Sequence, residues 1–250
     1  MKCEANAYPD PAMVAQVTRQ LVDAGNTVFQ IHRLAESQSD HVGELLSFFE
    51  PGKGASILDV GCGVGGVADL MSKSRPDLQF TLLNNSAEQL AICPPQFKTI
   101  CADAHDMPVP SESLDAVMIC YAIGHMDIER ALKECSRVTK KGGMLYLYDL
   151  TADECRLIDA FGCEAFSTKR IISSAAEAGY LLDKIFAPEA VHVEHFYDKM
   201  PKARFVELFA GIKPALFRFR KRTPAPISKI AGLKRRIVSI ALAALMPSGV

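Results

Sequence analysis

The chain has 250 residues, of which 49% are hydrophobic and 23% are charged, with a formal net charge of −1. This composition predicts one well-packed α/β domain with a small appendage and excludes two full domains or long disorder. No run of 18 apolar residues occurs, and the first ten residues lack the apolar segment of a secretory signal, so neither a spanning helix nor export is expected.

The predicted elements begin with two helices and continue as an alternation of strands and helices. Apolar residues recur at helical spacing over 11–49, with a break at Gly25-Asn26. Continuous apolar strands separated by helices then indicate a mostly parallel, seven-stranded sheet covered on both faces. The predicted strands are 56–60, 79–84, 98–102, 115–120, 143–149, 181–186 and 190–197, and the helices are 65–74, 86–92, 127–138 and 168–179.

A glycine-rich turn, GCGVGG, follows the first of these strands. Gly61, Gly63 and Gly65 let the backbone turn sharply and approach a ligand, and the helix that follows presents free N–H groups. Such a turn alone is weak evidence, because dinucleotide enzymes and plain turns also use one. Here the acidic Asp59 precedes the glycines, and we expect it to support the turn or a ligand's amino group.

Polar residues also follow the next two strands. Asn84 and Asn85 end the second strand, where Rossmann-like folds meet a ribose, and their amides can hydrogen-bond its hydroxyls. Asp103 follows the third strand and can accept a hydrogen bond from an adenine amino group. A structural turn or a cap is the alternative for each of these positions.

Together these segments resemble class I S-adenosylmethionine-dependent methyltransferases over residues 55–150. LDVGCGVGG and LLNNSAEQ resemble segments of the sterol and isoprenoid C-methyltransferase branch, and HDMPVP, SLDAV and RVTKKGG are similar to its later segments. The aromatic-rich segment that precedes the first motif in the sterol enzymes is not recognisable here. This departure counts against a sterol substrate and leaves a smaller isoprenoid open.

The resemblance implies a Rossmann-like domain over 51–200, with an N-terminal helical cap over 1–50 and a basic extension over 201–250. It implies that S-adenosylmethionine is the cofactor and S-adenosylhomocysteine the product. The residues that would bind them are Asp59, Gly61, Cys62, Gly63, Gly65, Asn84, Asn85, Gln89, Asp103 and Ala104.

The resemblance also implies C-methylation of a prenyl diphosphate or related alkene, through a carbocation that aromatic faces stabilise and a base deprotonates. The alternatives are N- or O-methylation of a small amine, phenol or natural-product intermediate, and a binding module without activity. A nucleic-acid substrate is not expected, because ICYAIG stands at 119–124 instead of an Asn- or Asp-Pro-Pro-aromatic segment. Mg²⁺ would accompany a diphosphate substrate.

Five residues are candidates for the chemistry or the substrate pocket. Tyr121 directly follows the fourth strand, and His125 lies four residues further on as a general base or diphosphate ligand. His32 and Glu36 are one helical turn apart and would share a face. Glu164 follows the fifth strand. For each, the alternative is an ordinary packed, capping or solvent-facing side chain.

The C-terminal part of the chain is basic: residues 201–250 hold eleven Lys or Arg and the single acid Glu207. A basic tail on an acidic body indicates an anionic partner, which is a phosphorylated substrate, a membrane surface or the body itself. Residues 227–246 are predicted to form an amphipathic helix, so peripheral membrane contact is one interpretation and a locally neutralised, solvated helix is another.

Eight cysteines are scattered without a CxxC pair, which fits neither a zinc site nor a disulfide framework. We therefore predict no metal site built by the protein and a reducing, cytoplasmic compartment. The sequence does not determine the oligomeric state, for which a homodimer is the working expectation.

Overall fold

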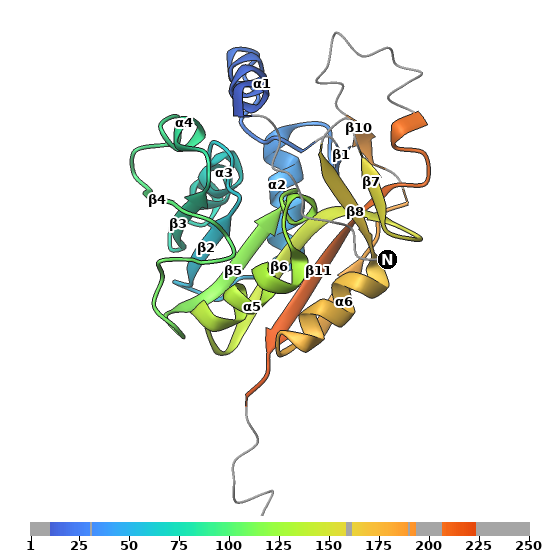
Figure 1. Cartoon of the computed structure of the whole chain (residues 1–250). Coiled ribbons are helices and arrows are strands. Elements are labelled where there is room, and N and C mark those ends of the chain that lie inside the picture. The colour runs from blue at the N-terminus through green and yellow to red at the C-terminus, as the bar shows by residue number, and fades with distance from the viewer. Residues whose placement is uncertain (1–10, 31, 159–161, 190, 194–206, 224–250) are drawn as a thin grey trace, which may run out of the picture.

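The computed structural model describes residues 11–30, 32–158, 162–189, 191–193 and 207–223 (Figure 1). Their central sheet has the strand order β4-β3-β2-β5-β6-β11-β9. Strands β4, β3, β2, β5 and β6 run parallel, and β11 is antiparallel to both β6 and β9, which confirms the predicted mostly parallel sheet. The strands are β2 (Ser56–Val60), β3 (Gln79–Asn84), β4 (Lys98–Cys101), β5 (Leu114–Cys120), β6 (Thr139–Ala152), β9 (Tyr180–Phe186) and β11 (Lys213–Lys221).

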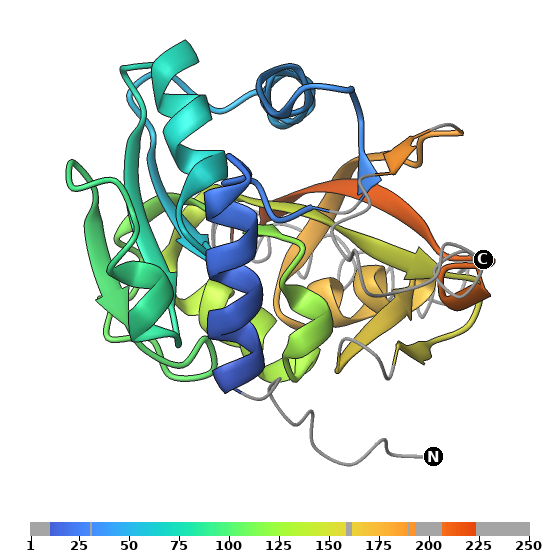
Figure 2. The same ribbon diagram turned by 90° about the horizontal axis from the view of Figure 1, so that it is seen from above.

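Helices cover both faces of this sheet, because its central strands are apolar on both sides. Helices α2 (Gln38–Phe49) and α3 (Gly66–Ser74) pack on the face that carries Ile57. Helices α5 (Ile128–Val138) and α6 (Thr168–Glu177) pack on the opposite face. Two further helices, α1 (Pro11–Asp23) and α4 (Ala87–Leu90), contact each other, and Figure 2 shows α1 lying across the molecule when it is seen from above.

Short elements complete the described structure. Strand β8 (Cys163–Ser167) extends the carboxyl end of β6 in parallel and pairs with β7 (Arg156–Ile158). Strand β1 (His32–Arg33) pairs with β10 (His192–Val193) in a separate two-stranded sheet. A single 3₁₀ turn, η1 (Ile123–His125), follows β5. No helix in the described ranges combines the length and apolar character that a bilayer crossing requires.

The expectation of helix up to residue 49 is wrong between the two N-terminal helices. Residues 26–30 and 32–37 are not helical and include the strand β1. Their backbone N–H groups find tertiary acceptors: those of Thr27 and Val28 donate to Gln38 Oε1 at 2.9 Å, and that of Leu34 donates to His41 Nδ1 at 2.9 Å. These bonds replace the helical ladder that the apolar spacing predicted.

The end of the sheet also lies further along the chain than the boundary placed at residue 200. Strand β11 inserts between β6 and β9, and the side chains of Phe217 and Phe219 are buried with their rings stacked 5.8 Å apart. The alternation of Phe with basic residues is thus the pattern of a strand with one buried face. The predicted helix 227–246 and most of the predicted strand 190–197 lie outside the described residues.

Two basic residues of β11 are neutralised by the body of the protein. The Arg218 guanidinium donates to Asp183 at 2.6 Å and also pairs with Glu50. The Lys221 ammonium pairs with the Glu112 carboxylate at 3.8 Å and donates to the carbonyls of Ser136 and Thr139, both at 2.6 Å. At these two positions, the anionic partner of the basic segment is therefore the acidic body of the protein itself.

We expect the substitution Phe217→Ala to lower the free energy of unfolding by about 3–5 kcal/mol, because it opens a cavity in the core. Phe186→Ala is the matched control, because that ring lies on the edge strand β9 and is 49% exposed. Urea unfolding of both variants measures the difference. Equal effects would contradict the placement of β11 inside the sheet.

Candidate functional site

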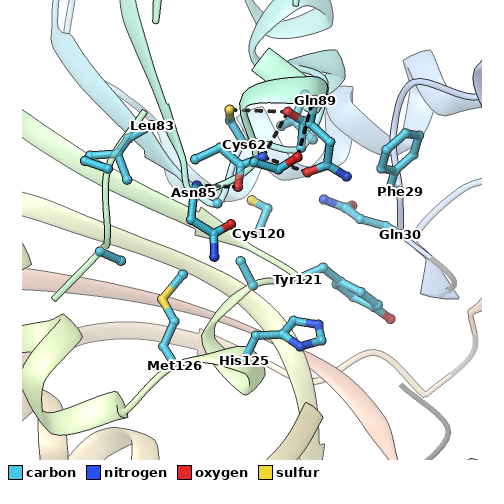
Figure 3. Close-up of a pocket in the computed structure, with 18 of the residues that line it drawn as sticks. Phe29, Gln30, Cys62, Leu83, Asn85, Gln89, Cys120, Tyr121, His125 and Met126 are labelled. Atoms are coloured by element: carbon cyan, nitrogen blue, oxygen red, sulfur yellow. Dashed lines mark hydrogen bonds between the residues drawn. The ribbon is translucent and has the colours of Figure 1, made fainter. Parts of the chain in front are cut away.

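A cavity of about 360 Å³ opens where the carboxyl ends of β2, β3, β4 and β5 meet. Adjacent parallel strands bring their following loops together at one edge of the sheet, which is where α/β folds bind ligands. The strap, defined as residues 27–30, closes the cavity from the N-terminal side (Figure 3). The lining residues are Thr27, Phe29, Gln30, Gly61, Cys62, Gly63, Val67, Leu83, Asn84, Asn85, Ser86, Glu88, Gln89, Ala102, Ala104, Cys120, Tyr121, Ala122, His125 and Met126.

The turn between β2 and α3 requires glycine for two separate reasons. Gly61 and Gly63 have φ of +71° and +57°, a region that side chains with a Cβ rarely adopt. A Cβ on Gly61 would also lie 2.4 Å from the Cβ of Ala122. The backbone of β2 can therefore reach the cavity and the loop after β5 only because no side chain intervenes.

The strap packs directly on this turn. A Cβ on Gly66 would lie 2.1 Å from the carbonyl oxygen of Thr27, and the ring of Phe29 lies next to Gly63. Helix α1 is tied to the same region, since Gln89 Nε2 donates to Thr18 Oγ1 at 2.8 Å. The N-terminal segment thus forms one wall of the cavity.

The two asparagines after β3 have different environments. Asn84 is buried, and its Nδ2 donates to Gln89 Oε1 at 2.7 Å and to the Gly63 carbonyl at 3.3 Å. Its Oδ1 accepts the backbone N–H of Asn85. Asn84 therefore holds the turn together, whereas the exposed Asn85 directs its amide into the cavity (Figure 3).

Asp59 is a buried carboxylate without full compensation. Its Oδ2 has no hydrogen-bond partner among the described residues, and the side chain is 2% exposed. Burial raises the pKa of Asp59 to about 7. Burial raises the pKa of Cys120, which lines the cavity, and the Asp59 carboxyl adds to that shift, so the carboxyl lies behind this wall. A cationic ligand group near this point would supply the missing partner.

Tyr121 has a constrained conformation at the end of β5. Its φ is +59°, which is rare for a bulky residue and is common at functional sites. Its hydroxyl accepts the backbone N–H of His32 at 3.1 Å and lies 2.8 Å from His32 Nδ1. Tyr148 donates to the His32 carbonyl at 2.6 Å, which fixes that segment.

The chemistry of this pair follows from the pKa values. Burial lowers the pKa of His32 to about 4, so its ring is neutral at pH 7, and its Nδ1 shares a hydrogen bond with the Tyr121 hydroxyl. Burial also raises the pKa of Tyr121 well above its ordinary value, so the phenol stays protonated. Tyr121 thus offers an aromatic ring to the cavity, and His32 positions it from behind.

His125 lines the cavity and is its candidate proton acceptor. Its Nδ1 lies 3.2 Å from the Gly162 carbonyl, which can only accept, so Nδ1 carries the proton. The lone pair is then on Nε2. Burial lowers the pKa of His125, so the ring is uncharged at pH 7 and is competent to take up a proton.

Six predicted site residues do not line the cavity. Asp59 and Gly65 lie behind the glycine turn, where Gly65 approaches Leu82. Asp103 points outward and pairs with His105 at 2.6 Å.

Glu36 is exposed and shares no helical face with His32, because 34–37 is not helical. Glu164 lies on β8, where its backbone packs on Gly124 and its carboxyl interacts with Arg170 and Glu129. His32 also lies outside the lining and acts through Tyr121.

Residues 58–147 match the family model described as "Methyltransferase domain". The chain contains a class I S-adenosylmethionine-dependent methyltransferase domain. It is 35% identical over 98 residues to the demethylmenaquinone methyltransferase of Thermotoga maritima, a match that covers 38% of this chain and 43% of that protein. The chain spans about half the length of the curated relatives it matches.

Solved structures show the same fold. The [4+2]-cyclase SpnF has a TM-score of 0.68 and 18% identity, covering 88% of this chain and all of that one. The geranyl diphosphate C-methyltransferase of Streptomyces coelicolor has a TM-score of 0.66 and 13% identity, covering 87% and 99%. At these identities the likeness confirms the predicted Rossmann-like methyltransferase fold and does not extend to the reaction.

Several residues that line the cavity of the methyltransferase domain were not among the predicted ones. The strap residues Thr27, Phe29 and Gln30 come from a segment expected to be helical, so their position depends on tertiary packing. Glu88 could have been predicted from the sequence. It is an acidic residue in the first helical turn after the second strand, so it faces the same ligand-binding edge of the sheet as Asn85.

We expect Gly66→Ala to destabilise the domain by about 1–3 kcal/mol, because the new methyl group must displace the strap backbone. Gly43→Ala is the matched control: it lies inside α2 with nothing within 4 Å of its Cβ position, so it should stabilise by about 0.5–1 kcal/mol. Urea denaturation compares the two, and changes of the same sign would contradict the packing of Thr27 on Gly66.

Proposed function

We propose that this protein transfers a methyl group from S-adenosylmethionine to a carbon atom of a small isoprenoid acceptor. The observation that carries the proposal is the cavity itself. Its lining brings a glycine turn together with an aromatic ring and a neutral imidazole at the end of β5, and a buried carboxylate with an unpartnered oxygen lies behind the turn.

The residues present fit the cofactor. The unpartnered Oδ2 of Asp59 calls for a cationic group, and the open turn at Gly61 and Gly63 leaves room for a ligand against the backbone. We assign the ribose to Asn85 and Glu88, and the base to the apolar walls at Ala102, Ala104, Leu83 and Met126. When bound, S-adenosylmethionine supplies a methyl group on a positively charged sulfur, which is an electrophile.

The end of β5 contributes the remaining chemistry. An alkene that gains a methyl group becomes a carbocation, and the Tyr121 ring can stabilise a positive charge over its face. His125 Nε2 can then remove a proton from the carbon next to the cation, which restores the alkene. Positioning of the acceptor is the third contribution, for which the strap provides the opposite wall.

The charges of the cavity favour a neutral acceptor over a diphosphate. No Lys or Arg is among the residues that line it in the described part of the chain, and Glu88 is its one acidic residue there. The described residues also hold no group of three His, Cys, Asp or Glu side chains that could bind a metal. A prenyl diphosphate with Mg²⁺ would therefore need binding groups from outside these residues.

O- or N-methylation is the second candidate, and His125 is the observation that favours it. A neutral imidazole that lines the cavity can also accept the proton that a phenol or an amine loses as it gains the methyl group. The matched relative from Thermotoga acts on demethylmenaquinone by its name, so a ring-bearing acceptor belongs in the same test.

We expect S-adenosylhomocysteine to bind about tenfold more weakly at about pH 6 than at about pH 8, because binding of its ammonium requires an ionised Asp59 whose pKa is near 7. The affinity is lost as the pH falls and this carboxyl takes up a proton. Calorimetry at several pH values measures it. Asp59→Asn should bind weakly with no such dependence, and an unchanged slope in that variant would contradict the assignment.

We expect labelled S-adenosylmethionine to methylate a neutral prenyl compound in a panel that also holds prenyl diphosphates, a sterol, phenols and amines. Mass spectrometry detects the gain of the labelled methyl group, and NMR of the product places it on carbon. A gain on oxygen or nitrogen alone would establish the second candidate. No transfer by a preparation that binds the cofactor would contradict both.

We expect His125→Gln to lower kcat about 100-fold while S-adenosylhomocysteine affinity stays unchanged, because a general base acts only in the chemical step. Tyr121→Phe keeps the ring, and Tyr121→Leu removes it. The leucine variant should be slower than the phenylalanine variant by about 3- to 30-fold. Equal rates for the two would exclude a role of the aromatic face.

A further inference from the structure

Two cysteines meet beneath the glycine turn. Cys62 lies within the turn and lines the cavity, while Cys93 follows α4 and is buried. They lie close enough for each thiol to affect the pKa of the other. Both thiols also lie near the Gly63 carbonyl oxygen, at 3.6 Å for Cys62 and 3.7 Å for Cys93.

We propose that Cys62 and Cys93 form an oxidation site, at which a peroxide converts the two thiols into a disulfide. The Cys93 sulfur attacks the O–O bond and retains one oxygen as a sulfenic acid, and the other oxygen leaves as water. The Cys62 sulfur then displaces the sulfenic hydroxyl, which leaves as a second water. The two thiols lose two electrons and two protons, and the peroxide gains them.

The environment of the pair assigns the order of the two sulfurs. The contact with Cys62 favours the thiolate of Cys93 and lowers the pKa of Cys93, whereas the same contact and burial raise the pKa of Cys62. A thiolate is the nucleophile in such reactions, so Cys93 reacts first and Cys62 resolves the intermediate. Cys62 is part of the cavity wall, and Cys93 lies behind it against the same Gly63 carbonyl, so a small oxidant reaches Cys93 from the cavity past Cys62 (Figure 3).

A disulfide here would change the glycine turn. The Gly63 carbonyl now has three neighbouring donors, namely the two thiols and Asn84 Nδ2 at 3.3 Å. Formation of the S–S bond consumes both thiol hydrogens, and only Asn84 remains. The turn must also move to bring the sulfurs to bonding distance. Oxidation should therefore weaken cofactor binding, a consequence that rests on the proposed function, whereas formation of the bond does not.

The test exposes the reduced protein to hydrogen peroxide, blocks free thiols with N-ethylmaleimide, and maps linked peptides by mass spectrometry. Wild type and Cys155→Ser should give the Cys62–Cys93 pair, and Cys93→Ser should not. Cys155→Ser is the matched control because its thiol is exposed and is not part of the cavity wall. Absence of the linked pair in wild type would overturn the proposal, whatever the folding of the variants.

The second readout is S-adenosylhomocysteine affinity by calorimetry. Oxidised wild type should bind at least about tenfold more weakly, since the turn must shift to form the S–S bond, and dithiothreitol should restore binding. A linked pair with unchanged affinity would overturn the effect on the turn. A reduced protein that does not bind would count against the proposed function, while the peptide map still decides the oxidation site.

Discussion

The close packing of the turn between β2 and α3 is the constraint on which the site depends. Gly61 leaves no room for a Cβ beside Ala122, and Gly66 leaves none beside the Thr27 carbonyl. The first contact joins the turn to the loop after β5, and the second joins it to the strap. Because interiors are packed to near-crystalline density, the three segments hold one another in place and enclose a cavity.

Two buried carboxylates in this region, Asp59 and Asp149, differ in whether the protein itself supplies all their hydrogen-bond partners. Burial raises the pKa values of both Asp59 and Asp149 to about 7. Asp149 accepts the backbone N–H groups of Ile123 and Leu150 at 2.9 and 2.7 Å, so it holds the η1 turn and is compensated. Asp59 Oδ2 has no such partner among the described residues. A carboxylate left unpaired at this cost is best explained by a ligand that pairs with it.

Tyr121 connects the sheet, the N-terminal segment and the cavity. Its backbone adopts a positive φ because its N–H donates to Tyr148 O at 2.7 Å while the ring turns toward the cavity. Its hydroxyl is held by His32, and His32 is held in turn by Tyr148. A strained residue that three contacts maintain is the kind that catalytic and binding sites use. The same network explains why 32–37 does not continue as a helix.

The sequence by itself determined the parallel sheet, its central strands, the glycine turn and the methyltransferase resemblance, because each depends on local patterns of apolar residues, glycines and strand ends. The tertiary structure decided the rest. The course of 26–37 depends on hydrogen bonds to Gln38, His41 and Tyr121, which lie outside that segment. The place of β11 depends on a long-range pairing that inserts a late strand between two earlier ones. Local patterns do not show which distant groups will hydrogen-bond to a given side chain or backbone segment. Those distant contacts make Asn84 structural while Asn85 faces the cavity, and they place His32 against Tyr121 while Glu36 is exposed.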